Sequence, residues 1–322
     1  MPHSVKNKLS RQELFFEKVL ASFSTRFASP TSDILSTRCI SKLALLKQLL
    51  LIRDEIAFPG HKRISGKDIL NLLERSKIIQ PIITLDPVTN QKQENFYLLG
   101  LTSSENIVDP IELLQALEPK GVICYFTALE FYGLTTQIPS HHHIAKLVHT
   151  SLRGRKKNYK NTPPSKKNHV FNPLGKNKFT YEDIPYYLTN RDTNLILGIK
   201  ERFLNERTKF RITSIEQTLL DTLHKPLSCG GSSVVFEAWE NAIDKMQSNI
   251  LLEYLQKINN NALSCRAGYM LQIMDYKINS DLSSFLSSVK NSVTRNNPEL
   301  AIPLLPGLNY HQFNQEWFIR TP

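Results

Sequence analysis

Three polar side chains near residue 70 are spaced so that they could read the edges of DNA bases. Lys67, Asn71 and Arg75 stand four residues apart in a segment, residues 66–76, whose core-facing side chains are expected to be Ile69, Leu72 and Leu73. If the apolar side chains face a core, the three polar ones share the outer surface. In the major groove, Asn pairs bidentately with adenine and Arg with guanine. The spacing indicates a DNA-reading helix, and the alternative is a solvated polar face on an ordinary helix.

Basic side chains on either side of this helix could hold the phosphate backbone of DNA. Two cations precede the helix, Ser65 can cap its first turn, and a further cation lies in the polar stretch 86–95 between two β-like runs. The residues expected to contact DNA are Lys62, Arg63, Ser65, Lys67, Asn71, Arg75, Lys77 and Lys92.

The neighbouring patterns predict the elements that position these residues. Helical spacing occurs over residues 12–23 and 41–57, ahead of the helix at 66–76. The β-like runs at 81–85 and 96–99 then predict a hairpin with an extended tip. Helices followed by such a hairpin are the order of a winged helix-turn-helix, and this order favours DNA contact over a merely solvated helix face.

The remaining patterns divide the chain into three parts. Residues 1–38 are expected to form a partly helical N-terminal extension, and residues 39–104 the winged helix-turn-helix domain. Residues 105–322 are expected to form a mixed domain in which strands are followed by helices to the end. The predicted fold class is therefore α+β.

Composition points to a polyanionic partner. The 322 residues contain 40 Lys and Arg against 29 Asp and Glu, which gives a formal charge of +11. Cations that face phosphates release condensed counterions, so a surplus of this size favours nucleic acid. The alternative is a globular protein with a basic bias.

Cysteine usage and hydropathy bear on the compartment. The four cysteines are scattered without a C-x-x-C pair, which argues against a zinc ribbon or a disulfide framework and is typical of a reducing cytosol. The first residues are polar, and no segment has the roughly 18 uninterrupted apolar residues of a membrane helix. We therefore expect a cytoplasmic protein with no membrane partner.

One segment of the second domain is strongly basic and carries no acid. Residues 151–169 contain two adjacent prolines and predict a mobile loop that could contact nucleic acid or an acidic protein surface. The alternative is a connector of no consequence. The cations concerned are Arg153, Arg155, Lys156, Lys157, Lys160, Lys166 and Lys167.

Two acids in the second domain could suggest catalysis. Glu216 and Asp221 follow a β-like run that ends at Thr213. The same spacing matches a capping box in which Thr213 is the N-cap and Glu216 is at N3, so we predict structural roles. Asp221 is expected to pair with a cation such as Arg211. The three histidines at 141–143 are expected to be surface or half-buried residues and not metal ligands, because neighbours on a strand alternate faces. We expect no metal and no cofactor.

Two longer motifs support a resemblance to a known family. They are Thr-Ala-Leu-x-x-x-Gly-Leu-Thr-Thr-Gln over Thr127–Gln137 and Arg-x-Thr-Ser-x-Glu-Gln-Thr-Leu-Leu-Asp over Arg211–Asp221. Residues 122–246 resemble the C-terminal domain of the AbiEi antitoxin family, which belongs to abortive-infection toxin–antitoxin systems of phage defence. The resemblance implies an antitoxin, not an enzyme, and the signature residues are Arg211, Thr213, Ser214, Glu216 and Asp221.

The resemblance also implies two partners. One is duplex DNA of the protein's own promoter, with inverted repeats, which the winged helix-turn-helix would bind to repress the operon. The other is a nucleotidyltransferase-like toxin, which the C-terminal domain would counter directly or indirectly. A different class of function remains open, namely a nuclease or nucleotidyltransferase with a DNA-binding N-terminal domain. That function requires acids on adjacent strands, and the sequence pattern reveals none.

Overall fold

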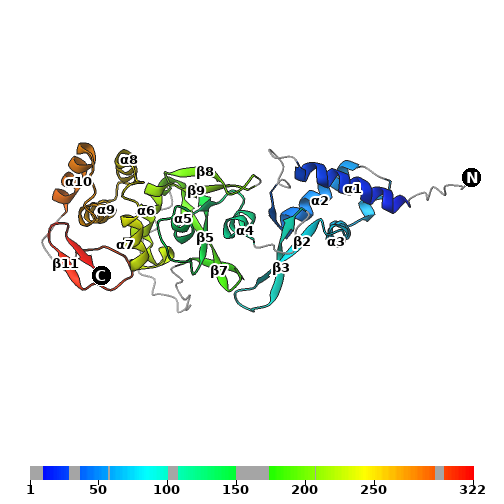
Figure 1. Ribbon diagram of the computed structural model, residues 1–322, viewed down its shortest axis with the longest axis horizontal. Coiled ribbons are helices and arrows are strands. Elements are labelled where there is room, and N and C mark those ends of the chain that lie inside the picture. Colours follow the sequence, from blue (N-terminus) through cyan, green and yellow to red (C-terminus); the bar gives the residue numbers. More distant parts are fainter. Residues whose placement is uncertain are drawn as a thin grey trace, which may run out of the picture. The chain divides into compact units, whose positions relative to one another are not determined.

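The chain forms two compact units of mixed α and β structure (Figure 1). The structure, a computed structural model, describes residues 10–28, 37–56, 59–100, 108–149, 174–206, 208–293 and 301–322. The N-terminal unit comprises Met1–Pro119 and Phe203–Phe210, and the C-terminal unit comprises Lys120–Arg202 and Arg211–Pro322. The expected α+β class is confirmed. The first division falls after Pro119, whereas the sequence suggested residue 104.

The described residues of the N-terminal unit form the helices α1 (Arg11–Ala28), α2 (Lys42–Ile56), α3 (Gly66–Arg75) and α4 (Pro110–Leu117), with a short 3-10 turn, η2 (His61–Arg63), before α3. Helix α1 places Phe15, Val19 and Phe23 in a core shared with α2 and α3. These three side chains have no exposed surface. The helical part of the expected extension is therefore an integral part of this unit.

Three antiparallel strands complete the N-terminal unit: β1 (Cys39–Ser41), β2 (Ile79–Leu85) and β3 (Lys92–Leu99), in the order β1-β3-β2. Strands β2 and β3 form the expected hairpin, with a register shift between Ile82 and Ile83. The sequence did not predict β1, in which Ile40 lies opposite Tyr97 of β3. Along the chain, the elements follow the order α1-β1-α2-α3-β2-β3 (Figure 1).

The C-terminal unit contains a mixed sheet whose strands are β4 (Val122–Ile123), β5 (His142–Val148), β6 (Lys176–Tyr181), β7 (Ile184–Asp192), β8 (Ile199–Phe203) and β9 (Lys209–Thr213). Their order is β6-β7-β5-β4-β9-β8. Strands β5 and β7 are parallel, as are β4 and β9, whereas β6 with β7 and β4 with β5 are antiparallel. The stretch Phe203–Phe210, which runs from the last residue of β8 to the second residue of β9, belongs to the N-terminal unit.

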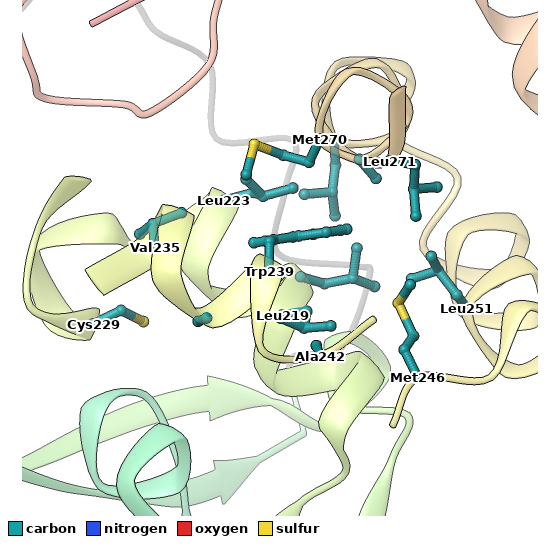
Figure 2. Packing of buried hydrophobic residues seen from close by; sticks show 14 of the residues in the cluster. Leu219, Leu223, Cys229, Val235, Trp239, Ala242, Met246, Leu251, Met270 and Leu271 are labelled. Atoms are coloured by element: carbon teal, nitrogen blue, oxygen red, sulfur yellow. The ribbon is translucent and has the colours of Figure 1, made fainter. Parts of the chain in front are cut away.

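Helices α5 (Phe126–Phe131), α6 (Ile215–His224), α7 (Ser232–Glu240), α8 (Ser248–Ile258), α9 (Asn261–Ile273) and α10 (Ser280–Ser292) belong to the same unit, together with the 3-10 turns η4 (Thr193–Leu195) and η5 (Pro226–Cys229). Figure 2 shows the indole of Trp239 at the centre of their apolar core, among Leu219, Leu223 and Met270. The indole nitrogen donates a hydrogen bond to the Thr222 hydroxyl (3.0 Å), so its polar atom is satisfied inside the core.

The sequence suggested that the second domain ends in helices, and this prediction is wrong. After α10 it forms a second small sheet from β10 (Ile302–Pro303), β11 (Gln312–Asn314) and β12 (Ile319–Thr321), in the order β10-β12-β11. Strands of two or three residues are too short to show the alternation by which a strand is predicted. Within the ranges that the structure describes, no helix is both long enough and apolar enough to cross a membrane.

Candidate functional site

Helix α3 begins at the residue that the sequence predicted. The Ser65 hydroxyl accepts a hydrogen bond from the Asp68 amide (3.2 Å), and the Asp68 carboxylate accepts one from the Ser65 amide (2.9 Å). This reciprocal pair is a capping box, which satisfies two amides that the helix leaves without partners. The hydrogen bonds from Ser65 lower the pKa of Asp68. Ser65 therefore fixes the start of α3.

The outer face of α3 carries the three side chains expected to read DNA. Lys67, Asn71 and Arg75 are exposed, and none of them makes a hydrogen bond or ion pair with another described residue. The acids of this helix are engaged, because Asp68 is in the capping box and Glu74 accepts a hydrogen bond from the Tyr97 hydroxyl (2.8 Å). The outer face is left with two cations and one amide.

The inner face of α3 differs from the prediction in one position. Ile69, Leu70 and Leu73 are buried, whereas Leu72, which was expected to face the core, is only partly buried. Leu70 takes the buried place that was expected for Leu72, and the three outer side chains remain exposed.

The expected phosphate contacts lie at both ends of α3. Lys62 and Arg63 are exposed in η2, and Lys77 is exposed just after the helix, where its φ of 55° ends the helical path. Arg53 of α2 donates a hydrogen bond to the Ile64 carbonyl (3.0 Å) and so holds the turn that carries Lys62 and Arg63. These cations flank Lys67 and Arg75 at the two ends of one helix.

The tip of the β2–β3 hairpin is organised by a single carboxylate. Asp86 accepts hydrogen bonds from the amides of Val88 (2.9 Å) and Thr89 (2.8 Å), which lower its pKa, and from the Gln93 side chain (3.1 Å). Lys92 is exposed at the first position of β3. The outermost side chain of the tip is Val88, which is 90% exposed. The hairpin therefore presents a rigid turn with a cation at its base.

The expected basic loop, residues 151–169, lies outside the described residues, so its role remains a prediction.

The signature acid Glu216 is structural, but not in the way that the sequence suggested. The N-cap of α6 is Ser214, whose hydroxyl accepts a hydrogen bond from the Gln217 amide (3.3 Å). Thr213 is still part of β9, and its hydroxyl lies 2.8 Å from that of Thr218. Glu216 accepts a hydrogen bond from the Gln247 amide at the start of α8 (3.1 Å). The predicted capping box is therefore wrong, because the strand continues one residue further than expected.

Asp221 pairs with an arginine that the sequence did not single out. The guanidinium of Arg191, at the end of β7, binds both carboxylate oxygens of Asp221, with Nη2 2.6 Å from Oδ1. The Gln217 side chain donates a further hydrogen bond to Oδ1 (3.0 Å). Arg211, the expected partner, donates instead to the Lys120 carbonyl (3.0 Å). Burial opposes the charged form of Arg191, but the Asp221 carboxylate raises the pKa of Arg191 overall.

Tyr125 completes this buried group. The Arg191 guanidinium lies over the Tyr125 ring. Its Cζ is 5.1 Å from the ring centroid, which is within cation–π range. Tyr125 has a φ of 58° and a ψ of −134°, a conformation that non-glycine residues rarely adopt. Sequence patterns carry no signal for either residue, because each acts through a partner distant along the chain.

The first signature motif also makes structural contacts. Thr135 and Thr136 donate hydroxyl hydrogen bonds to Glu237 of α7 (2.7 Å each), and the hydrogen bond from Thr135 is the main cause of the lowered pKa of Glu237. Gly133 has a φ of 58° just after α5, where a residue without a side chain carries no steric penalty. The motif therefore fixes the connection between α5 and α7.

The three histidines are buried, and the prediction that they lie at or near the surface is wrong. The ring centroids of His141, which precedes β5, and His143 lie 4.9 Å apart, and the His142 ring packs against Tyr186. Burial lowers the pKa of all three, that of His142 to about 4. Among the residues that the structure describes, no three His, Cys, Asp or Glu side chains are grouped so that they could hold a metal ion.

No family model matches the sequence, and no curated protein is similar to it in sequence. Among solved structures, the chain is similar to the crystal structure of the RV2827C protein from Mycobacterium tuberculosis, with a TM-score of 0.53 and 10% sequence identity. The match covers 96% of this chain and 91% of that chain. At this identity the similarity shows a shared fold and carries no further information about function.

Proposed function

We propose that the protein is a cytoplasmic DNA-binding repressor that also serves as the antitoxin of an AbiEi-type toxin–antitoxin system. In this proposal the N-terminal unit is a winged helix-turn-helix, in which α2 and α3 form the helix pair, α3 is the recognition helix and the β2–β3 hairpin is the wing. The order α1-β1-α2-α3-β2-β3 supports it, since the wing directly follows the helix that would enter the major groove.

The outer face of α3 is the observation that carries the DNA-binding proposal. Lys67, Asn71 and Arg75 form a stripe of unpaired donors, while the acids Asp68 and Glu74 are occupied within the unit. Unpaired Asn and Arg side chains on one helical face are the groups that recognise adenine and guanine.

Fluorescence anisotropy with a labelled duplex from upstream of the gene tests this function. Asn71→Ala or Arg75→Ala should weaken binding to this duplex by about 1–3 kcal/mol and relax the sequence preference. Lys62→Ala should weaken binding to every duplex equally, because it removes a phosphate contact. Lys200→Ala, an exposed cation of β8, serves as the matched control and should bind as the wild type does.

The salt dependence of the same measurement provides an independent check. The logarithm of the affinity should fall linearly with the logarithm of the salt concentration, with a slope of about −0.9 for each phosphate neutralised. Wild-type affinity that stays constant as salt rises, or α3 variants that bind as tightly as wild type, would rule out this interface.

The antitoxin part of the proposal rests on the two motifs in the C-terminal unit. Both are ordered by long-range contacts, Thr136 with Glu237 and Asp221 with Arg191, as expected of motifs that specify a fold. The nucleotidyltransferase-like toxin should be encoded next to this gene. Neutralisation is tested by co-expressing that toxin either with the wild-type protein or with a variant in which every Lys and Arg from Arg153 to Lys167 is replaced by Ser. Growth equal to that with the wild type would show that the basic segment has no role.

A nuclease or nucleotidyltransferase would need free carboxylates to hold a metal. Glu216 is bonded to the Gln247 amide and Asp221 to the Arg191 guanidinium, so neither acid supports that alternative. If Glu216→Gln abolished a metal-dependent activity on nucleic acid without changing the unfolding curve, the enzymatic alternative would replace our proposal.

A further inference from the structure

A cavity of about 190 Å³ lies in the C-terminal unit between the end of β7, one face of α6 and the start of α9. Tyr125, Arg191, Asp221 and Lys225 line it, together with apolar side chains such as Leu263. Tyr125 directly precedes α5, and Asp221 ends the second signature motif. Residues from separate parts of the chain therefore converge on one small space.

Two features in the wall of this cavity are energetically costly. Tyr125 holds a φ of 58°, and strained backbone of this kind costs about 1–3 kcal/mol and tends to occur at ligand sites. The Arg191–Asp221 pair is almost fully buried, and the desolvation of such a pair offsets most of its attraction. Apolar side chains would fill the same space at lower cost, so the two features favour a binding role.

Two cations at the cavity, Arg191 and Lys225, have donors that no residue described by the structure engages. Asp221 is satisfied by Arg191 and Gln217, and Asp192 accepts a hydrogen bond from the Asn194 amide (2.9 Å). In contrast, the Lys225 ammonium makes no hydrogen bond or ion pair with any residue that the structure describes. Arg191 has five N–H donors, of which the carboxylate of Asp221 engages two. A ligand that completes these groups must bring acceptors and negative charge.

We propose that this cavity binds a small oxyanion, carried as a phosphate or carboxylate group. A cavity of this volume has room for inorganic phosphate or a small organic acid. Lys225 supplies the charge at the rim, and the remaining donors of Arg191 bind the same oxyanion from within. Neither DNA reading nor toxin neutralisation requires this ligand, so the site is additional to the proposed function.

Calorimetric titration of the full-length protein tests the site with three probes at matched ionic strength: inorganic phosphate, ribose 5-phosphate and succinate. At least one probe should bind saturably, and the comparison shows whether phosphate or carboxylate is preferred. Lys225→Gln should weaken that binding at least tenfold, and Lys225→Arg should restore most of it. Lys200→Gln removes an equal charge from an exposed position of β8 and should bind as wild type.

Unfolding curves establish that each variant is folded before titration. They are followed by fluorescence, because the two tryptophans, Trp239 and Trp317, both lie in the C-terminal unit. The proposal is overturned if no probe binds saturably to the wild type, or if folded Lys225→Gln binds as tightly as wild type. DNA affinity should be the same in Lys225→Gln and wild type, so failure of this site is distinguishable from failure of the DNA interface.

Discussion

Protonation of His142 should destabilise the C-terminal unit as the pH falls below neutrality. The side chain is 2% exposed, its ring centroid is 5.1 Å from that of Tyr186, and its Nδ1 lies 3.3 Å from the Thr127 hydroxyl. Burial, with a smaller contribution from His141, lowers the pKa of His142 from 6.5 to about 4. The ring is therefore neutral in the folded protein at pH 7, and charging it requires a proton to enter the core.

The magnitude follows from the difference in proton affinity between the two states. The pKa of His142 is about 6.5 in the unfolded chain and about 4 in the folded protein. The free energy of unfolding is thus unaffected above pH 6.5, falls between about pH 6.5 and pH 4, and levels off below that. A shift of about 2.5 pKa units corresponds to about 3 kcal/mol. That is a large fraction of the roughly 5–15 kcal/mol by which a domain is stable.

Urea unfolding at a series of pH values measures this effect, with tryptophan fluorescence reporting on the C-terminal unit. His142→Phe retains an aromatic ring against Tyr186 and removes the titrating group. The His142→Phe variant also loses the contact with Thr127, and this loss lowers the stability of the variant by an amount that does not depend on pH. The difference in stability between wild type and His142→Phe should therefore decrease by about 3 kcal/mol from pH 7 to pH 4. His311→Gln, at an exposed position, is the matched control and should follow the wild type. Parallel pH profiles for wild type and His142→Phe would refute the reasoning.

Three further substitutions have defined outcomes. Ser65→Ala removes the N-cap of α3 and should lower the stability of the N-terminal unit by about 1 kcal/mol in circular dichroism, with Ser65→Thr close to wild type. Arg191→Ala leaves the carboxylate of Asp221 buried and unpaired and should cost about 3–5 kcal/mol in the fluorescence assay; a loss below 1 kcal/mol would show that the pair is solvated. Gly198→Ala would push a Cβ into the Tyr254 hydroxyl and should cost about 1–3 kcal/mol, whereas an unchanged unfolding curve would mean that the neighbouring segments yield freely.

The N-terminal unit shows what local patterns can predict. The capping box at Ser65, the polar outer face of α3 and the β2–β3 hairpin all follow from residues that interact within a few positions of one another. Strand β1 was missed because it has three residues and is defined by its pairing with β3, in which Ile40 lies opposite Tyr97. The packing of α1 was missed for the same reason: helical spacing predicts an apolar face and does not say what covers it.

Two of the errors in the C-terminal unit share one physical cause, the choice between equivalent partners. Thr213 and Ser214 are both capable N-caps, and the choice depends on how far β9 extends, which its pairing with β4 determines. Arg211 and Arg191 are equally good partners for Asp221 by residue type, and only the path of β7 brings Arg191 to it. The sequence predicts that a buried acid needs a cation, but the topology decides which cation it obtains.

These contacts also explain why the signature motifs indicate a fold more directly than a function. Glu216 is bonded to the start of α8, Asp221 to β7 and Thr136 to α7, so each polar side chain ties its own segment to a different one. A buried polar group is costly unless its partner is in place, and each bond therefore selects one arrangement of helices over others that bury similar apolar area. The carboxylate oxygens committed to such bonds are unavailable to a ligand. Function in this protein should accordingly be sought where donors are left unpaired, on the outer face of α3 and at Lys225, and these are the positions at which our variants distinguish binding from folding.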